Sequence, residues 1–207
     1  MQDREKPLKI DFLGGAVAHR LHQGGGRNQA LPKAVGMKKG KTPDIVDATA
    51  GLGRDAFLLA SLGAKVTLIE RSTHVHELLV NAMDAARTHN EQMAQIMARM
   101  TLLHADAKTL LPALCPEVIL VDPMHPPRTN SALVKQELRQ IRQIVGTDED
   151  APELMQVALS CARNRVVLKW PQKAPPMKDI PAPSYKIEGK TTRYDVFLTP
   201  PTQPESR

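Results

Sequence analysis

The sequence has few aromatic residues, only two cysteines and no long apolar run. Phe, Trp and Tyr make up 3% of its 207 residues, so a core has to be built from aliphatic side chains and methionine. Cys115 and Cys161 lie far apart without metal-ligand spacing, which predicts reduced thiols and no metal site. The charged N-terminus lacks the apolar segment of a signal peptide, and nowhere do about 18 apolar residues follow one another. We therefore expect a cytoplasmic protein without a membrane span.

What the sequence has in excess is positive charge. Its 28 Lys and Arg residues against 22 Asp and Glu residues give a formal charge of +6. Such a balance favours polyanionic partners such as RNA, although many proteins without such partners share it. A hydrophobic share of 42% and a charged share of 24% are typical of a globular protein. The length suffices for one α/β domain with a sizeable core.

Composition and periodicity divide the chain into three parts. Residues 1–42 are rich in glycine and basic residues, which predicts an irregular arm or lid, and residues 201–207 predict a flexible tail. Between them, short apolar runs alternate with helical patterns, which is typical of βαβ units and a mainly parallel sheet. The predicted strands are residues 45–48, 65–70, 101–105, 118–122, 165–170, 185–188 and 194–198, of which the last two predict an antiparallel hairpin. The predicted helices are residues 54–62, 74–100, 131–145 and 151–162.

A glycine turn, Asp47-Ala-Thr-Ala-Gly51-Leu-Gly53, follows the first predicted strand and precedes a helix. In parallel sheets such a turn lets a ligand approach the backbone and the helix N-terminus. Glu70 ends the next strand, where a carboxylate can accept both hydroxyls of an adenosine ribose. Asp106 follows the third strand and can accept a hydrogen bond from an adenine amino group. Taken singly, these residues fit a plain turn and solvated strand ends; together they predict an adenosine site.

The residues of this turn favour S-adenosylmethionine over NAD as the ligand. The dinucleotide fingerprint has a third glycine where Ala56 stands. Asp47 suits the ammonium group of a methionine moiety and repels a pyrophosphate. A dehydrogenase that binds NAD at the same corner is the alternative that the sequence leaves open.

A second motif, Asp122-Pro123-Met124-His125-Pro-Pro127, follows the fourth predicted strand. Enzymes that methylate exocyclic amines use a turn of the form Asp/Asn-Pro-Pro-aromatic, because the lone pair of such an amine is delocalised into its ring. The side chain of Asp122 and the carbonyl of Pro123 can accept the two amine hydrogens and turn the lone pair toward a methyl donor. His125, in place of Phe or Tyr, can stack on an extruded base and adds a titratable group. The plainer interpretation is a loop capped by Asp122 and stiffened by proline.

These motifs together resemble the RsmJ family, the bacterial 16S ribosomal RNA (guanine-N2)-methyltransferases, over about residues 10–198. The resemblance implies a class I methyltransferase fold, Rossmann-like, with residues 43–200 as the methyltransferase domain. It also implies S-adenosylmethionine as donor, S-adenosylhomocysteine as product and a guanine amine near the 3′ end of 16S rRNA as acceptor. The motifs that carry the resemblance are Asp47-Ala-Thr-Ala-Gly-Leu-Gly-Arg-Asp-Ala-Phe57, Glu70-Arg71, Asp122-Pro-Met124, Ser131-Ala-Leu-Val-Lys135, Asp11-Phe-Leu-Gly-Gly-Ala-Val-Ala-His-Arg20 and Gly24-Gly-Gly-Arg27.

The resemblance and the motifs assign roles to individual residues. Members of the family commonly carry a further segment before the position of Met1, and Phe at the position of His125. The predicted catalytic residues are Asp122, Pro123 and His125. The predicted donor-binding residues are Asp47, Gly51, Gly53, Arg54, Asp55, Glu70, Arg71, Asp106, Ala107 and Asp122.

Basic residues predict where 16S rRNA or the 30S subunit is held. Lys135, Arg139 and Arg142 are spaced four and three apart on a predicted helix, which puts them on one face. The predicted RNA contacts are Arg20, Arg27, Lys135, Arg139 and Lys169, with Lys33, Lys38, Lys39 and Lys41 as further basic residues of the arm. Two alternatives remain open, namely methylation of another amine in nucleic acid or protein and a noncatalytic RNA-binding ribosome-assembly factor.

Overall fold

The computed structural model describes residues 8–14, 26–124, 140, 146, 148–189 and 191–199. The strands are β1 (Ile45–Asp47), β2 (Val66–Glu70), β3 (Met100–His104), β4 (Val118–Val121), β5 (Arg165–Pro171), β6 (Tyr185–Glu188) and β7 (Thr192–Leu198). The helices are η1 (Gly26–Asn28), α2 (Ala30–Ala34), α3 (Arg54–Ser61), α4 (Thr73–Arg87), α5 (Glu91–Met97), α6 (Ala107–Leu114) and α8 (Ala151–Cys161).

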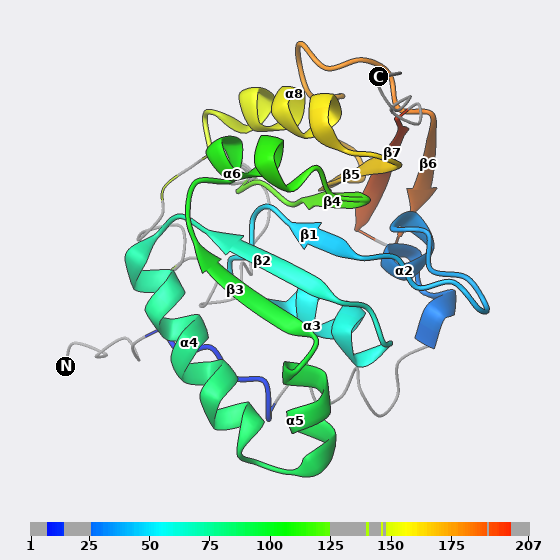
Figure 1. Ribbon diagram of the computed structural model, residues 1–207. Coiled ribbons are helices and arrows are strands. Elements are labelled where there is room, and N and C mark those ends of the chain that lie inside the picture. The colour runs from blue at the N-terminus through cyan, green and yellow to red at the C-terminus, as the bar shows by residue number, and fades with distance from the viewer. Residues whose placement is uncertain are drawn as a thin grey trace, which may run out of the picture.

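The strands form one sheet in the order β3-β2-β1-β4-β5-β7-β6. The first five of these are parallel, and β7 pairs antiparallel with both β5 and β6. Helices cover both faces of the sheet, with α3, α4 and α5 on one side and α6 and α8 on the other (Figure 1). The mainly parallel sheet with a C-terminal antiparallel hairpin that the sequence predicts is therefore confirmed. None of the helices in the described ranges is long and apolar enough to cross a membrane.

The central strands are apolar because both of their faces are covered. All residues of β1 and β4 are buried, which explains why these strands read as continuous apolar runs rather than as an alternation. On the first face Leu59 of α3 and Leu79 of α4 belong to one core cluster. On the second face Leu111 of α6 and Met155 of α8 belong to another.

One predicted helix is wrong, and one helix of the structure was not predicted. The single helix predicted over residues 74–100 is two helices, because the Asn90 side chain accepts a hydrogen bond from the Met93 amide at 2.8 Å and so starts α5. Helix α6 was not predicted, since Pro112 in its interior removes a backbone donor. Asp106 caps α6 by accepting a hydrogen bond from the Lys108 amide at 2.8 Å. The helix predicted over residues 131–145 falls in a range of which the structure describes Gln140 alone.

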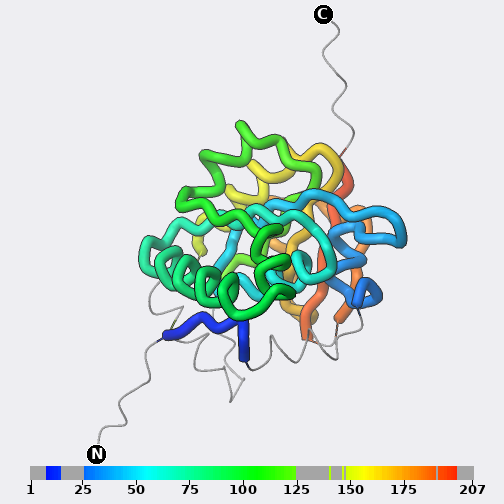
Figure 2. The backbone as a smooth tube through the Cα atoms, turned by 60° about the horizontal axis from the view of Figure 1, so that its bottom comes forward, coloured from blue at the N-terminus to red at the C-terminus, as the bar shows by residue number. Residues whose placement is uncertain are grey.

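The described parts of residues 1–42 are built into the core. Phe12 is 1% exposed and stacks on Phe57 of α3 with ring centroids 5.2 Å apart, and the segment around it passes alongside α4 (Figure 2). In α2, Leu31 and Ala34 are buried in the same cluster. The sequence predicted an irregular arm here because glycines and basic residues separate the few apolar residues of residues 1–42.

Candidate active site

The glycine turn depends on left-handed backbone and on close packing. Gly51 and Gly53 have φ angles of 51° and 67°, which a residue with a Cβ adopts at a cost. A Cβ on Gly53 would also lie 2.9 Å from Cδ2 of Leu79 and 3.0 Å from Cζ of Phe12. Gly53 is the N-cap of α3, so this packing fixes where the helix begins. The turn therefore presents its backbone and the first residues of α3 at the carboxyl edge of the sheet.

Glu70 is tied to this turn. Its side chain is buried, with Oε2 accepting the Gly51 amide at 3.0 Å and Oε1 accepting the Ser72 amide at 2.8 Å. Burial raises the pKa of Glu70, and the two amides oppose that rise. Because a carboxylate offers about four lone-pair sites, acceptors remain for the hydroxyls of a ribose.

A small cavity of about 40 Å³ lies at the ends of β1 and β3. Its lining includes Thr49 of the glycine turn together with Asp106 and Ala107, the residues that start α6. Arg71 lines it too, and its guanidinium pairs with Asp148 and, at 2.8 Å, with Asp150. Three of the predicted donor-binding residues, Arg71, Asp106 and Ala107, therefore line one cavity.

Residues 122–124 of the second motif, which we call the reacting turn, are held by two hydrogen bonds. The Asp122 amide donates to Oγ1 of Thr49 at 2.7 Å, and the Met124 amide donates to Oδ2 of Asp148 at 2.7 Å. Pro123, between them, is buried. Neither Thr49 nor Asp148 was among the predicted site residues. Thr49 stands inside the glycine turn, which is a local signal, whereas no pattern relates Asp148 to Met124, 24 residues earlier.

Lys169 connects the reacting turn with the start of helix α3, which follows the glycine turn. Leu168 of β5 pairs with Val121 of β4, so Lys169 emerges next to Asp122. Its ammonium lies 2.6 Å from Oδ2 of Asp122 and 2.6 Å from Oδ2 of Asp55, in the first turn of α3. The pKa of Lys169 is raised well above its ordinary value by these two carboxylates, although burial opposes the rise. The lysine predicted to contact RNA phosphate thus has its charge compensated within the protein.

The edge carries a surplus of negative charge. Asp47 is 3% exposed and accepts the Thr49 amide at 3.1 Å. Burial, together with Asp55 and Asp122, raises the pKa of Asp47 to about 7. Burial also raises the pKa of Asp122, against the effect of Lys169. With one lysine among three carboxylates, the site suits a ligand that carries positive charge and disfavours a pyrophosphate.

Several of the predicted RNA-contact and catalytic residues lie away from this edge of the sheet or outside the residues that the structure describes. Arg20, His125, Lys135 and Arg139 fall outside the described residues. The Arg27 guanidinium donates to the Lys38 carbonyl at 2.7 Å, to Oγ1 of Thr42 at 2.8 Å and to the Leu62 carbonyl at 3.0 Å. In the part of the chain that is described, no group of three His, Cys, Asp or Glu side chains could hold a metal ion.

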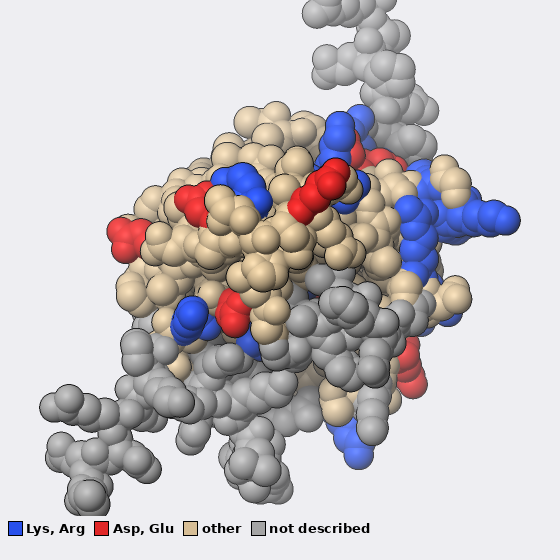
Figure 3. Space-filling view, turned by 90° about the horizontal axis from the view of Figure 1, so that it is seen from below, with Lys and Arg blue, Asp and Glu red and all other residues tan. Residues whose placement is uncertain are grey.

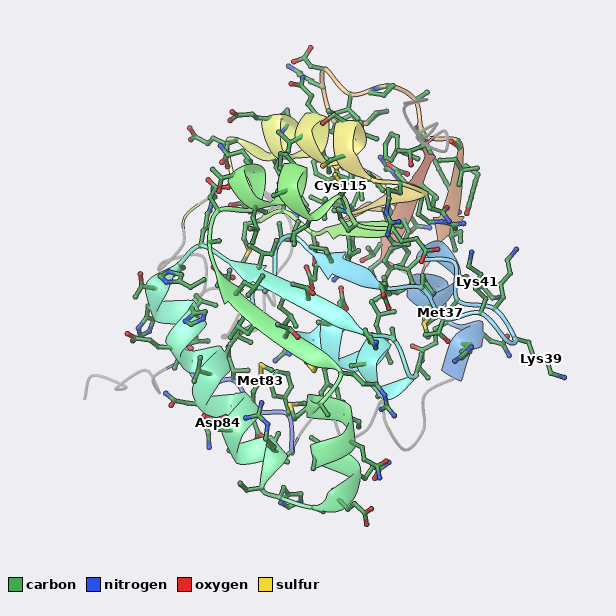
Figure 4. The ribbon with its side chains drawn as sticks, in the orientation of Figure 1. Met37, Lys39, Lys41, Met83, Asp84 and Cys115 are labelled. Carbon is green, nitrogen blue, oxygen red and sulfur yellow. The ribbon has the colours of Figure 1, made fainter. Side chains whose placement is uncertain are left out.

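Arg27 braces a turn that carries exposed lysines. The backbone of Lys38 pairs with that of Lys41, and both side chains, with that of Lys39 between them, are exposed. Lys39 points away from the fold (Figure 4), whereas the Lys41 ammonium lies 3.5 Å from Oε1 of Glu117. Lys and Arg side chains gather on this side of the surface (Figure 3). We call residues 38–41 the lysine turn. It precedes β1 and so lies at the amino edge of the sheet, away from Asp122.

The parallel sheet, the left-handed glycine turn and the acidic ends of β1, β2 and β4 define a class I S-adenosylmethionine-dependent methyltransferase. The family model described as "Putative SAM-dependent methyltransferase" matches residues 1–199, and the chain belongs to this family. The NAD dehydrogenase that the sequence left open is therefore excluded. The residues present fit the donor in their chemistry, because Asp47, Glu70 and Asp106 at the strand ends are carboxylates that can accept hydrogen bonds.

Individual relatives narrow the family further. The chain is 64% identical over 191 residues to a "Ribosomal RNA small subunit methyltransferase J" from Brucella anthropi, covering 92% of this chain and 93% of the relative. It is 58% identical over 198 residues to the protein of the same name from Agrobacterium fabrum, covering 96% and 95%. A solved SAM-dependent methyltransferase from Neisseria gonorrhoeae is 32% identical and has a TM-score of 0.74, with 96% of this chain and 77% of that chain covered. The chain is thus a member of the methyltransferase J family.

Proposed function

We propose that the protein transfers the methyl group of S-adenosylmethionine to the exocyclic N2 amine of a guanosine in 16S rRNA. Ribosomal RNA as substrate is supported by the names of the relatives. An amine as acceptor is supported by one observation above all, the Asp122-Pro123 turn fastened next to the glycine turn through Thr49. Guanine N2 is favoured by the resemblance of the sequence motifs. An rRNA substrate also agrees with the cytoplasmic location that the sequence predicts.

The donor is held along the carboxyl edge of the sheet. Glu70 accepts the ribose hydroxyls, and Asp106 with the Ala107 amide recognises the adenine. Asp47 accepts the ammonium group over Gly51 and Gly53. The residues that complete the donor site are Arg54, Asp55, Arg71 and Asp122. The bound donor supplies an electrophilic methyl group on a positively charged sulfur.

The acceptor amine is oriented by the chain. A carboxylate oxygen of Asp122 and the Pro123 carbonyl accept its two hydrogens, which aims the nitrogen lone pair at the methyl group. A nitrogen–carbon bond forms as the sulfur–carbon bond breaks, and the electron pair of that bond stays on sulfur. The amine proton becomes acidic only after the bond has formed, and it then leaves through Asp122 to water. Asp122 therefore acts mainly by position.

The RNA is held by basic residues from several segments of the chain. His125 stacks on the extruded base. The phosphates are contacted by Arg20, Lys135 and Arg139 and by the lysine turn that Arg27 braces.

A deletion strain tests the proposal. Nucleosides from its 16S rRNA are compared with those of the parent by mass spectrometry, and we expect one N2-methylguanosine to be lost and restored by the cloned gene. Purified protein with radiolabelled S-adenosylmethionine should then methylate rRNA or 30S subunits from the deletion strain but not from the parent. An unchanged modification profile would contradict the proposal. Loss of a different methylated amine would support amine methylation and exclude guanine N2 as the acceptor.

A further inference from the structure

We infer that Lys169 is a positioning residue that holds the Asp122 carboxylate in one orientation, and is not a contact for RNA phosphate. The inference rests on the proposed function, because it concerns the residue that orients the acceptor amine. Its basis is the pair of 2.6 Å contacts from the Lys169 ammonium to Asp122 and Asp55.

Among the described residues, the contacts of Asp122 leave one of its carboxylate oxygens for the substrate. Lys169 binds Oδ2, while Oδ1 accepts no hydrogen bond from the residues that the structure describes. A carboxylate fixed through one oxygen presents the other in a constant direction, which is what an amine with two hydrogens needs. The Asp122 amide, bound to Thr49, fixes the backbone of the same residue. The side chain and backbone are thus restrained independently.

The charges explain why a cation is needed at this place. Asp122 lies near Asp55 and Asp148, and both raise its pKa, as burial does. Lys169 is the cation that opposes them. Without it, the pKa of Asp122 would rise further, and a protonated carboxyl oxygen is a poorer acceptor for a hydrogen of the amine.

A phosphate contact requires a different arrangement. A lysine that binds RNA backbone is normally exposed and acts as a free point charge. The Lys169 side chain is 24% exposed and already faces two carboxylates, whereas Lys39 of the lysine turn is exposed and points away from the fold (Figure 4). An RNA phosphate would also be repelled by Asp55 and Asp122 at this position.

The two roles give different responses to substitution. Lys169→Met keeps much of the length and removes the charge, and we expect kcat to fall about 100-fold, as for a displaced reacting group, with little change in KM for RNA. The acid limb of the pH profile of kcat should move to higher pH. Lys169→Arg should restore part of kcat. Lys186→Met, on the exposed strand β6, removes the same charge away from the site and serves as the control.

A measurement on the free protein makes the test independent of the RNA. The Asp122 carboxyl is followed by carbon NMR, with Asp122→Asn to assign its signal. Lys169→Met should raise the pKa of Asp122, and Asp55→Asn should lower it, because Asp55 opposes its ionisation and competes for Lys169. If Lys169→Met does not fold, judged by its melting temperature, Lys169→Arg and Asp55→Asn still decide the matter.

Two outcomes overturn the inference. One is an Asp122 titration that is the same in all variants. The other is a loss in Lys169→Met confined to KM for RNA, with a weaker dependence on salt, which is the response of a phosphate contact. Absence of methylation by the unaltered protein would instead contradict the proposed function, and the NMR titration would still report on Lys169.

Discussion

The backbone amide of Asp122 donates to the hydroxyl of Thr49 at 2.7 Å, which joins the reacting turn to the glycine turn. The Thr49 side chain thus connects the turn that binds the methyl donor with the turn that binds the methyl acceptor. Replacing Thr49 by Val keeps the shape and removes the acceptor. We expect a loss of about 1–3 kcal/mol in the free energy of unfolding, because the amide is left without its partner, and a lower kcat. Thr49→Ser, which keeps the hydroxyl, should behave like the unaltered protein in both denaturant melts and kinetics.

Asp122 should be required for transfer, whereas its loss should weaken donor binding without abolishing it. Asp122→Ala removes the acceptor of the amine hydrogen, so radiolabel transfer should become undetectable. Calorimetry should still show S-adenosylhomocysteine binding, since Glu70 and the glycine turn remain. Full activity in Asp122→Ala would remove Asp122 from the mechanism.

Gly53 should tolerate no side chain. Its φ of 67° and the contacts of an added Cβ with Leu79 and Phe12 combine strain with overpacking. We expect Gly53→Ala to lower the free energy of unfolding by about 1–3 kcal/mol for the overpacking alone, plus the strain. Gly40→Ala is the matched control, because Gly40 has a φ of 78° with nothing within 4 Å of an added Cβ. Equal urea midpoints for the two variants would show that packing at Gly53 is unimportant.

Asp47 should make the unliganded protein less stable as the pH rises. Its pKa is raised from 3.8 to about 7 in the folded state, so the folded protein binds the proton more tightly than the unfolded chain does. This contribution to stability is complete below pH 4 and is lost as the pH rises through 7. Relative to Asp47→Asn, the unaltered protein should lose at most about 4 kcal/mol, since one pKa unit corresponds to about 1.4 kcal/mol.

The comparison of the two proteins isolates Asp47, because Glu70 and Asp122 also have raised pKa values. Thermal melts between pH 4 and pH 8 measure the difference. The cationic donor favours the ionised carboxylate, so its addition should reduce the loss. A difference between the two proteins that does not vary with pH would contradict the assigned pKa.

Arg27 should contribute to both thermal stability and RNA binding, whereas Lys39 should contribute to RNA binding alone. Arg27→Met removes three hydrogen bonds that hold the lysine turn, so we expect both a lower melting temperature and weaker RNA binding. Lys39→Ala should leave the melting temperature unchanged and lower the slope of RNA affinity against salt by about one. Filter binding at several salt concentrations measures this slope. If Lys39→Ala leaves the slope unchanged, the lysine turn does not contact RNA.

The sequence by itself determined the parallel sheet, because apolar runs that are buried on both faces alternate with helical patterns. It also determined the glycine turn and the acidic strand ends, since each is a local motif at the end of an element. The break between α4 and α5 and the whole of α6 were missed. The cap at Asn90 lay inside a continuing apolar period, and Pro112 argued against a helix that tertiary packing nevertheless stabilises.

Only the tertiary structure decided which charged groups meet. Lys169 lies 114 residues from Asp55 and 47 from Asp122, and β5 must pair with β4 before its ammonium comes within 2.6 Å of both carboxylates. Arg27 likewise became a brace only when η1 came to lie near Leu62 and the lysine turn. Local patterns report which residue types stand at a strand end. The partner of a charged side chain depends on contacts between segments far apart in the chain, and those contacts are set by the packing of the sheet.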